Sequence, residues 1–283
     1  MAVRIVNGHR VVYVPYEYDS IMDIERHWNE EKAFSIASAY WAYCIPISIA
    51  YVVVIFALEW FMRDRKAFNL KTGLVVWNSL LAVFSIVGTY RFGLEFVHAV
   101  SGSFTESVCL SIDPTTPAGF WATAFGVSKL VELFDTVFLV LRKRPLIFLH
   151  WYHHAVVVIA VWHAAIGFTA SARWFAIMNY AVHSVMYTYY ALAAAGVRLP
   201  RRVSMCVTTL QIAQMVVGVG ITLYVLAVKL AGGFCQQTAS NLALLFTIYA
   251  SFFFLFARFF HKAYIAAKPK KLPENGVKET KVE

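Results

Sequence analysis

Charged residues are scarce in this sequence. Of its 283 residues, only 14% are Asp, Glu, Lys or Arg, whereas 60% are hydrophobic. This composition lies outside the range of soluble globular domains and indicates a polytopic membrane protein. The first 33 residues also lack the apolar run of a cleavable signal peptide. We therefore expect the first membrane-spanning helix to direct insertion.

Seven apolar segments are long enough to cross a bilayer, which requires about 20 residues of helix. They are too long and too uniformly apolar for the strands of a barrel. The sequence predicts an all-α fold with a seven-helix membrane domain at 34–262, preceded by a lumenal segment 1–33 and followed by a cytoplasmic tail 263–283. The segments lie near residues 35–58, 74–97, 118–141, 146–166, 174–195, 203–228 and 239–260.

Lys and Arg are absent from three of the connecting loops. Loops 98–117, 167–172 and 232–238 contain none, whereas the other loops and the tail are basic. This alternation fits the positive-inside rule and predicts a lumenal N-terminus and a cytoplasmic C-terminus. The net charge of +9 mostly reflects this bias, so no nucleic-acid partner is expected. The basic mouth would suit an anionic, phosphate-bearing substrate, although the same charges could serve topology alone.

Only four cysteines are present. Cys109 and Cys235 fall in loops assigned to the lumenal side, where an oxidising compartment would permit a disulfide. Cys44 and Cys206 lie in or beside the spans, where we interpret them as small apolar residues.

Polar side chains gather near the cytoplasmic ends of four spans. At about 1.5 Å of rise per residue they lie at similar depths. Within each span they recur every three or four residues, which places them on one helix face. Because ionisable groups are costly in lipid, they face a polar interior. We predict a site open to the cytoplasm that continues as an apolar tunnel. The residues are Lys129, Glu132, Asp135, Thr136, His150, His153, His154, His183, Tyr187, Tyr190, Thr208, Gln211 and Gln214.

These groups also allow structural interpretations. Lys129 could pair with Glu132 or Asp135 only to fix helix register, and His183 or the glutamines could be interhelical hydrogen bonds. Three histidines within five residues are harder to explain in this way.

Three polar residues lie nearer the lumenal ends of the spans. Arg91 and Glu95, one helical turn apart, are interpreted as a structural ion pair. His163, at a helix end, is interpreted as a hydrogen-bonded structural residue.

Three function classes compete. The HxxHH spacing could belong to a metal oxygenase of the membrane desaturase or hydroxylase type, with Glu132 and Asp135 completing the ligand set. A metal-free acyltransferase could use imidazole as nucleophile and base, with coenzyme A at the basic mouth and a fatty chain in the tunnel. A seven-helix receptor or transporter is less consistent, because no polar path crosses to the lumen.

Four motifs resemble those of the fatty acid elongase family of the endoplasmic reticulum, in the same order and spacing. They are KLVELFDT, FLHWYHH, NYAVHSVMYTYY and TTLQIAQ. The run WNSLLAVFSIVGTYR and the Trp-Tyr pair inside LHWYHH resemble the subgroup that extends saturated and monounsaturated acyl-CoAs of about twelve to sixteen carbons. The C-terminal KETKVE matches a dilysine retrieval signal only in part.

The resemblance implies condensation of long-chain acyl-CoA with malonyl-CoA to 3-ketoacyl-CoA, CO2 and coenzyme A, without a metal or other cofactor. No cysteine lies in the polar layer, so we expect a histidine, His153 first, to form an acyl-imidazole. A direct ternary condensation is the alternative.

The remaining residues are expected to assist this chemistry. His150, His154, His183 and either Gln211 or Gln214 would orient rings and hold oxyanions. Lys129, Glu132, Asp135, Tyr187 and Tyr190 would organise the layer. Predicted substrate contacts are Asn179, Met186, Thr208 and Arg258. The expected partners are the two substrates, membrane lipid, a second copy of the chain and other enzymes of the elongation cycle.

Overall fold

The computed structural model describes residues 1–266, and these residues are mostly helical. The predicted helical fold is confirmed, with one small hairpin added at the N-terminus. The cytoplasmic tail predicted at 263–283 falls mainly outside the described residues. The elements are β1 (Ala2–Val6), β2 (His9–Tyr13), α1 (Glu30–Tyr40), η1 (Trp41–Tyr43), α2 (Cys44–Phe61), α3 (Lys71–Gly102), α4 (Phe104–Cys109), α5 (Pro117–Val131), α6 (Phe134–Leu141), α7 (Phe148–Ile166), α8 (Ala172–Ala195), α9 (Arg201–Leu230), α10 (Ala239–Phe260) and η2 (His261–Ile265).

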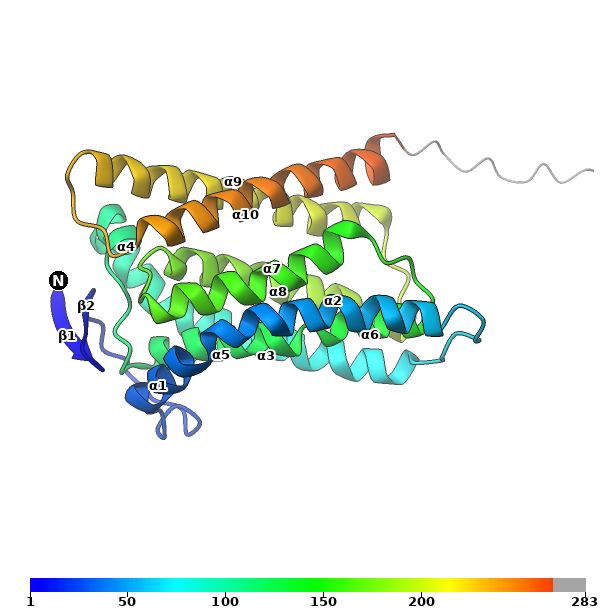
Figure 1. Ribbon diagram of the computed structural model, residues 1–283, viewed down its shortest axis with the longest axis horizontal. Coiled ribbons are helices and arrows are strands. Elements are labelled where there is room, and N and C mark those ends of the chain that lie inside the picture. Colours follow the sequence, from blue (N-terminus) through cyan, green and yellow to red (C-terminus); the bar gives the residue numbers. More distant parts are fainter. Residues whose placement is uncertain (267–283) are drawn as a thin grey trace, which may run out of the picture.

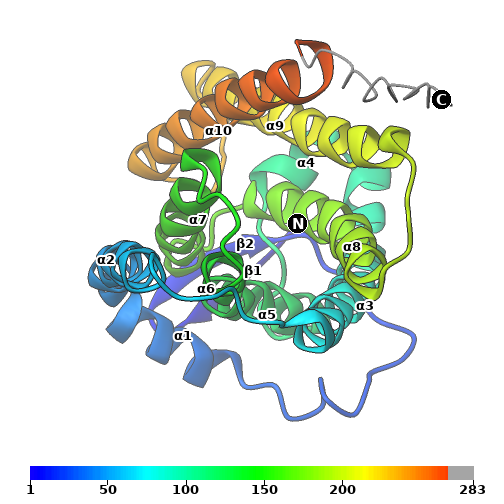
Figure 2. The ribbon, with the colours of Figure 1, turned by 90° about the vertical axis from the view of Figure 1, so that its right-hand side faces the viewer.

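Six helices form a closed ring. Going round it, α5 packs on α7, α7 on α10, α10 on α9, α9 on α8, α8 on α3, and α3 returns to α5. Figure 2 views this ring along the bundle, with α2 outside it against α6 and α7. The two strands are seen through the centre, at the far end. The bundle therefore encloses an interior that can hold a site.

Figure 1 shows the two ends of the bundle. The hairpin end carries β1, β2, α4 and the α7–α8 and α9–α10 loops. The opposite end, here called the basic end, carries the α2–α3, α6–α7 and α8–α9 loops. These last three loops all carry Lys or Arg, whereas the α4–α5, α7–α8 and α9–α10 loops carry none.

Within residues 1–266, four helical stretches are long and apolar enough to cross a membrane. They are Glu30–Phe61, Lys71–Gly102, Arg201–Leu230 and Ala239–Ile265. Many of their large apolar side chains are exposed, as expected for helices whose outer faces contact lipid. The chain is thus a multi-pass membrane protein, and the count of seven crossings stays a prediction.

Local sequence signals set several helix ends. The Asn29 side chain accepts a hydrogen bond from the Lys32 N–H and caps α1. Pro117 occupies the first turn of α5, where its missing N–H costs nothing. Gly196 ends α8 with a φ of 100°, a left-handed conformation that favours glycine.

The predicted third span is two helices, not one. α5 ends at Val131 and α6 begins at Phe134. Between them the hydrogen bonds span three residues instead of four, for example from the Asp135 N–H to the Glu132 carbonyl at 3.0 Å. No proline or glycine marks this break, so propensity gave no signal for it. The break places Lys129 in the last turn of α5 and Asp135 in the first turn of α6, where the helix dipoles favour those charges.

A close approach joins α3 to α8. At Gly88 the Tyr180 ring lies against the backbone, so that any Cβ there would collide with it. The Tyr180 hydroxyl then donates to the Trp121 carbonyl of α5 at 2.8 Å. One buried tyrosine therefore connects three helices of the ring.

The interpretation of Arg91 and Glu95 as an ion pair is wrong. Arg91 pairs with Glu25 of the N-terminal segment, at 2.5 Å, and Glu95 pairs with Arg173 of α8, at 2.8 Å. Helical spacing identifies local neighbours only, whereas both partners here come from distant parts of the chain. His163, by contrast, is hydrogen-bonded as predicted, to Asn241 at 3.0 Å.

Candidate active site

A cavity of about 650 Å³ opens inside the basic end of the ring, and we call it the reaction chamber. Polar side chains from α6, α7, α8 and α9 converge on it, as the sequence predicted. Of the predicted site residues, those that line the chamber are Asp135, His150, His153, His154, Asn179, His183, Met186, Tyr187, Tyr190, Thr208, Gln211 and Gln214.

The three α7 histidines lie together along one face of the helix. The ring centroids of His150 and His154 are 4.5 Å apart, and those of His153 and His154 are 5.6 Å apart. The Nε2 atom of His150 is 3.0 Å from the Thr136 hydroxyl, which in turn is 2.6 Å from the Tyr51 hydroxyl. The first histidine is thus held by a polar chain that reaches α2.

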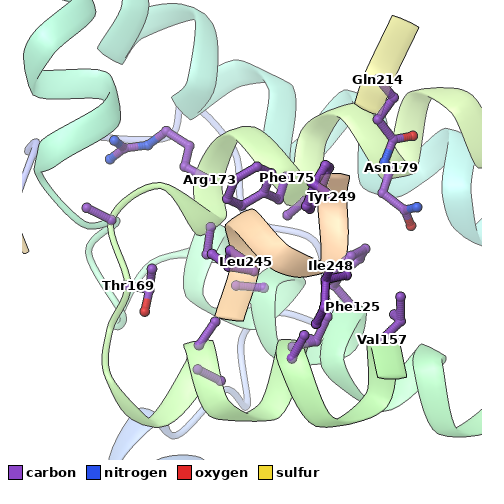
Figure 3. Close-up of a pocket in the computed structure, with 18 of the residues that line it drawn as sticks. Phe125, Val157, Thr169, Arg173, Phe175, Asn179, Gln214, Leu245, Ile248 and Tyr249 are labelled. Carbon is purple, nitrogen blue, oxygen red and sulfur yellow. The ribbon is translucent and has the colours of Figure 1, made fainter. Parts of the chain in front are cut away.

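His153 occupies the junction between the chamber and a second cavity. That cavity, of about 120 Å³, is lined mainly by apolar side chains, and we call it the apolar channel. Asn179 and Gln214 also line both cavities. In Figure 3 these two residues lie at one end of the channel, with Val157 and Ile248 along it and Thr169 at the other end.

The His153 ring is held by packing and has no hydrogen bond within the described part of the chain. Its Nδ1 atom is buried without a partner. The Phe252 ring of α10 lies 4.6 Å from it, centroid to centroid. Because Nδ1 is enclosed, Nε2 is the nitrogen that can reach a ligand in the cavities.

His183 is held in the opposite way, by a closed polar network. Lys129 Nζ donates to Glu132 Oε1 at 2.7 Å and to Asn179 Oδ1 at 2.8 Å. The Asn179 amide nitrogen is 3.1 Å from His183 Nε2, and His183 Nδ1 is 3.7 Å from Glu132 Oε1. Lys129 and Glu132 are buried behind the wall and do not line the chamber. Their effect on a ligand must pass through His183 and Asn179.

Asp135 uses both carboxylate oxygens. Oδ1 accepts from the Trp77 indole N–H at 2.5 Å, and Oδ2 accepts from the Tyr187 hydroxyl at 2.7 Å. Trp77 was not among the predicted residues. It lies on α3, outside the four motifs, and only its indole N–H hinted at a polar partner.

Of the remaining predicted residues, Thr208, Gln211 and Tyr190 line the chamber and Arg258 does not. Gln211 Nε2 is 3.2 Å from Met186 Sδ, and the Thr208 hydroxyl is 3.3 Å from the Tyr264 hydroxyl. Tyr190 lines the chamber but is 42% exposed. Arg258 is exposed and does not line either cavity.

The chamber has a basic mouth. Arg142 and Arg144 line it and also line a neighbouring surface recess of about 270 Å³, together with Lys71. This arrangement can hold the phosphates of an anionic ligand whose other end enters the chamber.

Metal-ligand geometry is not found in the described residues. No group of three or more His, Cys, Asp or Glu side chains within 1–266 is arranged to hold an ion. Glu132 is instead engaged by Lys129, and Asp135 by Trp77 and Tyr187.

Comparison with known proteins identifies the family. The ELO: GNS1/SUR4 family matches residues 36–272. This chain belongs to that family. "Putative fatty acid elongase 4" of Caenorhabditis elegans is 49% identical over 266 residues, which cover 93% of this chain and 91% of the relative. "Very long chain fatty acid elongase 3" of Homo sapiens is 38% identical over 272 residues, 95% of this chain and 97% of the relative.

A third relative, "Very long chain fatty acid elongase 6" of Drosophila melanogaster, is 43% identical over 267 residues, 90% of this chain and 82% of the relative. The predicted membership of the elongase family is confirmed. In this ELO protein, residues of all four motifs, carried by α6, α7, α8 and α9, line one chamber. The subgroup of acyl-chain lengths stays a prediction.

Proposed function

We propose that this chain condenses long-chain acyl-CoA with malonyl-CoA, giving 3-ketoacyl-CoA, CO2 and coenzyme A. The observation that carries the proposal is the position of His153, where a polar chamber with a basic mouth meets an apolar channel. A fatty acyl thioester has these two halves, with its reactive carbonyl between them. The relatives' names support the same activity.

The first half of the proposed reaction transfers the acyl group to His153. Nε2 attacks the thioester carbonyl, the C–N bond forms, and the C–S bond breaks to release coenzyme A. Nδ1 keeps its proton, so the acylated ring is cationic until the second half of the reaction, and the leaving thiolate takes a proton from water at the open mouth of the chamber. Gln214 lines both cavities beside His153 and supplies an amide donor for the oxyanion.

The second half forms the new carbon–carbon bond. Malonyl-CoA loses CO2, and the resulting enolate carbon attacks the acyl carbonyl. The C–N bond to His153 breaks and the imidazole is regenerated. His183, fixed by Glu132 and Asn179, faces the chamber and is suited to stabilise the enolate oxygen.

The roles proposed for the other predicted residues depend on where each lies relative to His153 and the chamber. His150 and His154 orient the His153 ring, and Asp135 with Tyr187 organises the α6–α8 wall. Asn179, Met186 and Thr208 are proposed substrate contacts because they line the chamber. Arg258 does not line it, so any contact with substrate would have to be with the part of coenzyme A outside the chamber.

We propose the endoplasmic reticulum membrane as the location, with a lumenal N-terminus and a cytoplasmic C-terminus. Two features at opposite ends support this orientation. The Cys109–Cys235 disulfide lies at the hairpin end, as an oxidising lumen would permit. The basic loops lie at the other end, as the positive-inside rule requires of the cytoplasmic side. A second copy of the chain and other enzymes of the elongation cycle are proposed partners.

The test is to incubate purified protein with palmitoyl-CoA and malonyl-CoA and to analyse both the product and the bound metal. A 3-keto product longer by two carbons, formed without stoichiometric iron, is expected. Oxygen consumption with bound iron would instead identify a histidine-box oxygenase, the alternative function.

A further inference from the structure

Two loops contribute to the far end of the apolar channel, which Ile112 and Arg173 also line. Ser111 of the α4–α5 loop and Thr169 and Ala170 of the α7–α8 loop line the channel there. All three are small and almost completely buried. The room at this end therefore depends on where the two loops are held.

Gln236, in the α9–α10 loop, binds these loops together with all of its polar groups. Its backbone N–H donates to the Cys109 carbonyl at 2.9 Å, and its carbonyl accepts from the Ala170 N–H at 2.9 Å. Its side-chain Oε1 accepts from the Val12 N–H at 2.7 Å, and Nε2 donates to the Phe168 carbonyl at 3.3 Å. One residue of the α9–α10 loop thus joins the end of α4, the α7–α8 loop and the N-terminal hairpin.

Two further contacts hold Ser111 in place. Its backbone N–H donates to the Val12 carbonyl at 2.8 Å, so the loop adds to the edge of the hairpin. Its carbonyl accepts from Arg173 Nη2 at 2.7 Å. Arg173 is 1% exposed and also paired with Glu95, so its guanidinium is fully occupied by protein groups.

We propose that Gln236 sets the maximum length of acyl chain that the channel accepts, because its hydrogen bonds hold in place the loops that line the far end. This inference rests on the proposed function. Small side chains on the two loops line this end, so its depth depends on the hydrogen bonds that Gln236 makes to the α7–α8 loop, to Cys109 at the end of α4 and to the hairpin. Losing the Gln236 amide releases Val12 and Phe168 and lets the loops move apart, which makes room for further methylene groups.

The test uses the Gln236→Ala protein and a series of saturated acyl-CoAs of increasing length, each with malonyl-CoA. Two values of kcat/KM are compared, one for an acyl-CoA just too long for the wild type and one for its preferred substrate. The ratio of the first to the second is expected to rise about tenfold in the variant. A tenfold change is the lower end of the range for one methylene group that does not fit a pocket. Thr105→Ala is the matched control. It removes a hydrogen bond to Tyr224 at the same end without touching the channel, and should leave the ratio unchanged.

A folded, active Gln236→Ala protein with the wild-type length profile would overturn the proposal. If that variant does not fold, wild-type protein with its adjacent Cys109–Cys235 disulfide reduced provides the second test. A shift to longer products is expected, and an unchanged profile after demonstrated reduction would overturn the proposal. Failure of the wild type to form a 3-keto product at any chain length would refute the proposed function instead.

Discussion

His153 of α7 and Phe252 of α10 lie against each other, with ring centroids 4.6 Å apart, where the reaction chamber meets the apolar channel. His183 has a different environment, a network of Glu132, Lys129 and Asn179. One imidazole is thus positioned by packing and has a nitrogen free to react, while the other is positioned by polar groups. This difference supports the assignment of His153 as nucleophile and His183 as an electrostatic group.

Replacing Phe252 by Leu should slow acyl transfer more than it weakens substrate binding, to which the ring contributes as part of the channel lining. The ring fixes the imidazole, and a displacement of about 1 Å in a reacting group can cost roughly a hundredfold in rate. The measurement is the rate of coenzyme A release from acyl-CoA alone, compared with KM. Phe253→Leu changes the adjacent, 42% exposed residue and should leave this rate unchanged. If coenzyme A is released at the same rate by the two variants, Phe252 does not position His153.

Replacing Lys129 by Met should destabilise the fold strongly. The change leaves the buried Glu132 carboxylate without its cation, and breaking such a pair typically costs about 3–5 kcal/mol. Thermal unfolding in detergent should show a lower midpoint, partly restored in the Lys129→Met/Glu132→Gln double variant. The exposed Lys66→Met is the control. No recovery in the double variant would show that the loss is not electrostatic.

Glu25 should make stability depend on pH. Burial alone would raise its pKa, but hydrogen bonds from Arg91, from the Met22 N–H and from Trp121 outweigh it and hold the pKa below its ordinary value of 4.5. The stabilisation is therefore present above pH 4.5 and is lost as the pH falls below it.

The unfolding midpoint of the wild type should drop as the pH is lowered below about 4.5, the ordinary value for this carboxyl. Glu25→Gln should be less stable than the wild type at neutral pH and should lose part of this slope. Identical slopes for the two proteins would show that Glu25 is not responsible.

Replacing Ala164 by Phe should shorten the acyl chains that are accepted. Ala164 lines the channel about three helical turns beyond His153, roughly 16 Å along α7. A ring there occupies the space of the distal methylene groups, so kcat/KM for the longest substrates should fall about tenfold or more relative to shorter ones. Competition between acyl-CoAs of different length measures this ratio. A uniform loss at all lengths would contradict the assigned path.

Periodicity predicted the polar layer that lines the chamber because the members of this layer lie close together in sequence along each helix. The spacing of His150, His153 and His154, and of His183 and Tyr187, placed these side chains on single helix faces. The high cost of ionisable groups in lipid then required those faces to meet. Both inferences need only the separation of residues along the chain and their depth in the membrane. The predicted residues of these helices line the chamber.

Long-range partners could not be predicted in this way. Arg91 and Glu95 have helical spacing, yet each pairs with a residue far along the chain. The break between Val131 and Phe134 has no helix-breaking residue. Such features depend on tertiary contacts, here with Glu25, Arg173 and the polar network around Lys129. The Cys109–Cys235 disulfide was predicted because the distribution of Lys and Arg assigned both cysteines to the lumenal side, where an oxidising compartment permits it.

The central claim is tested most directly by intact-protein mass spectrometry after incubation with acyl-CoA in the absence of malonyl-CoA. We expect one acyl adduct per chain, on a peptide containing His153, and release of an equal amount of coenzyme A. The His153→Ala protein should show neither the adduct nor the release. His163→Ala, which alters a structural histidine near the hairpin end, should retain both. Release of coenzyme A only after malonyl-CoA is added, with no acylated protein at any time, would contradict it.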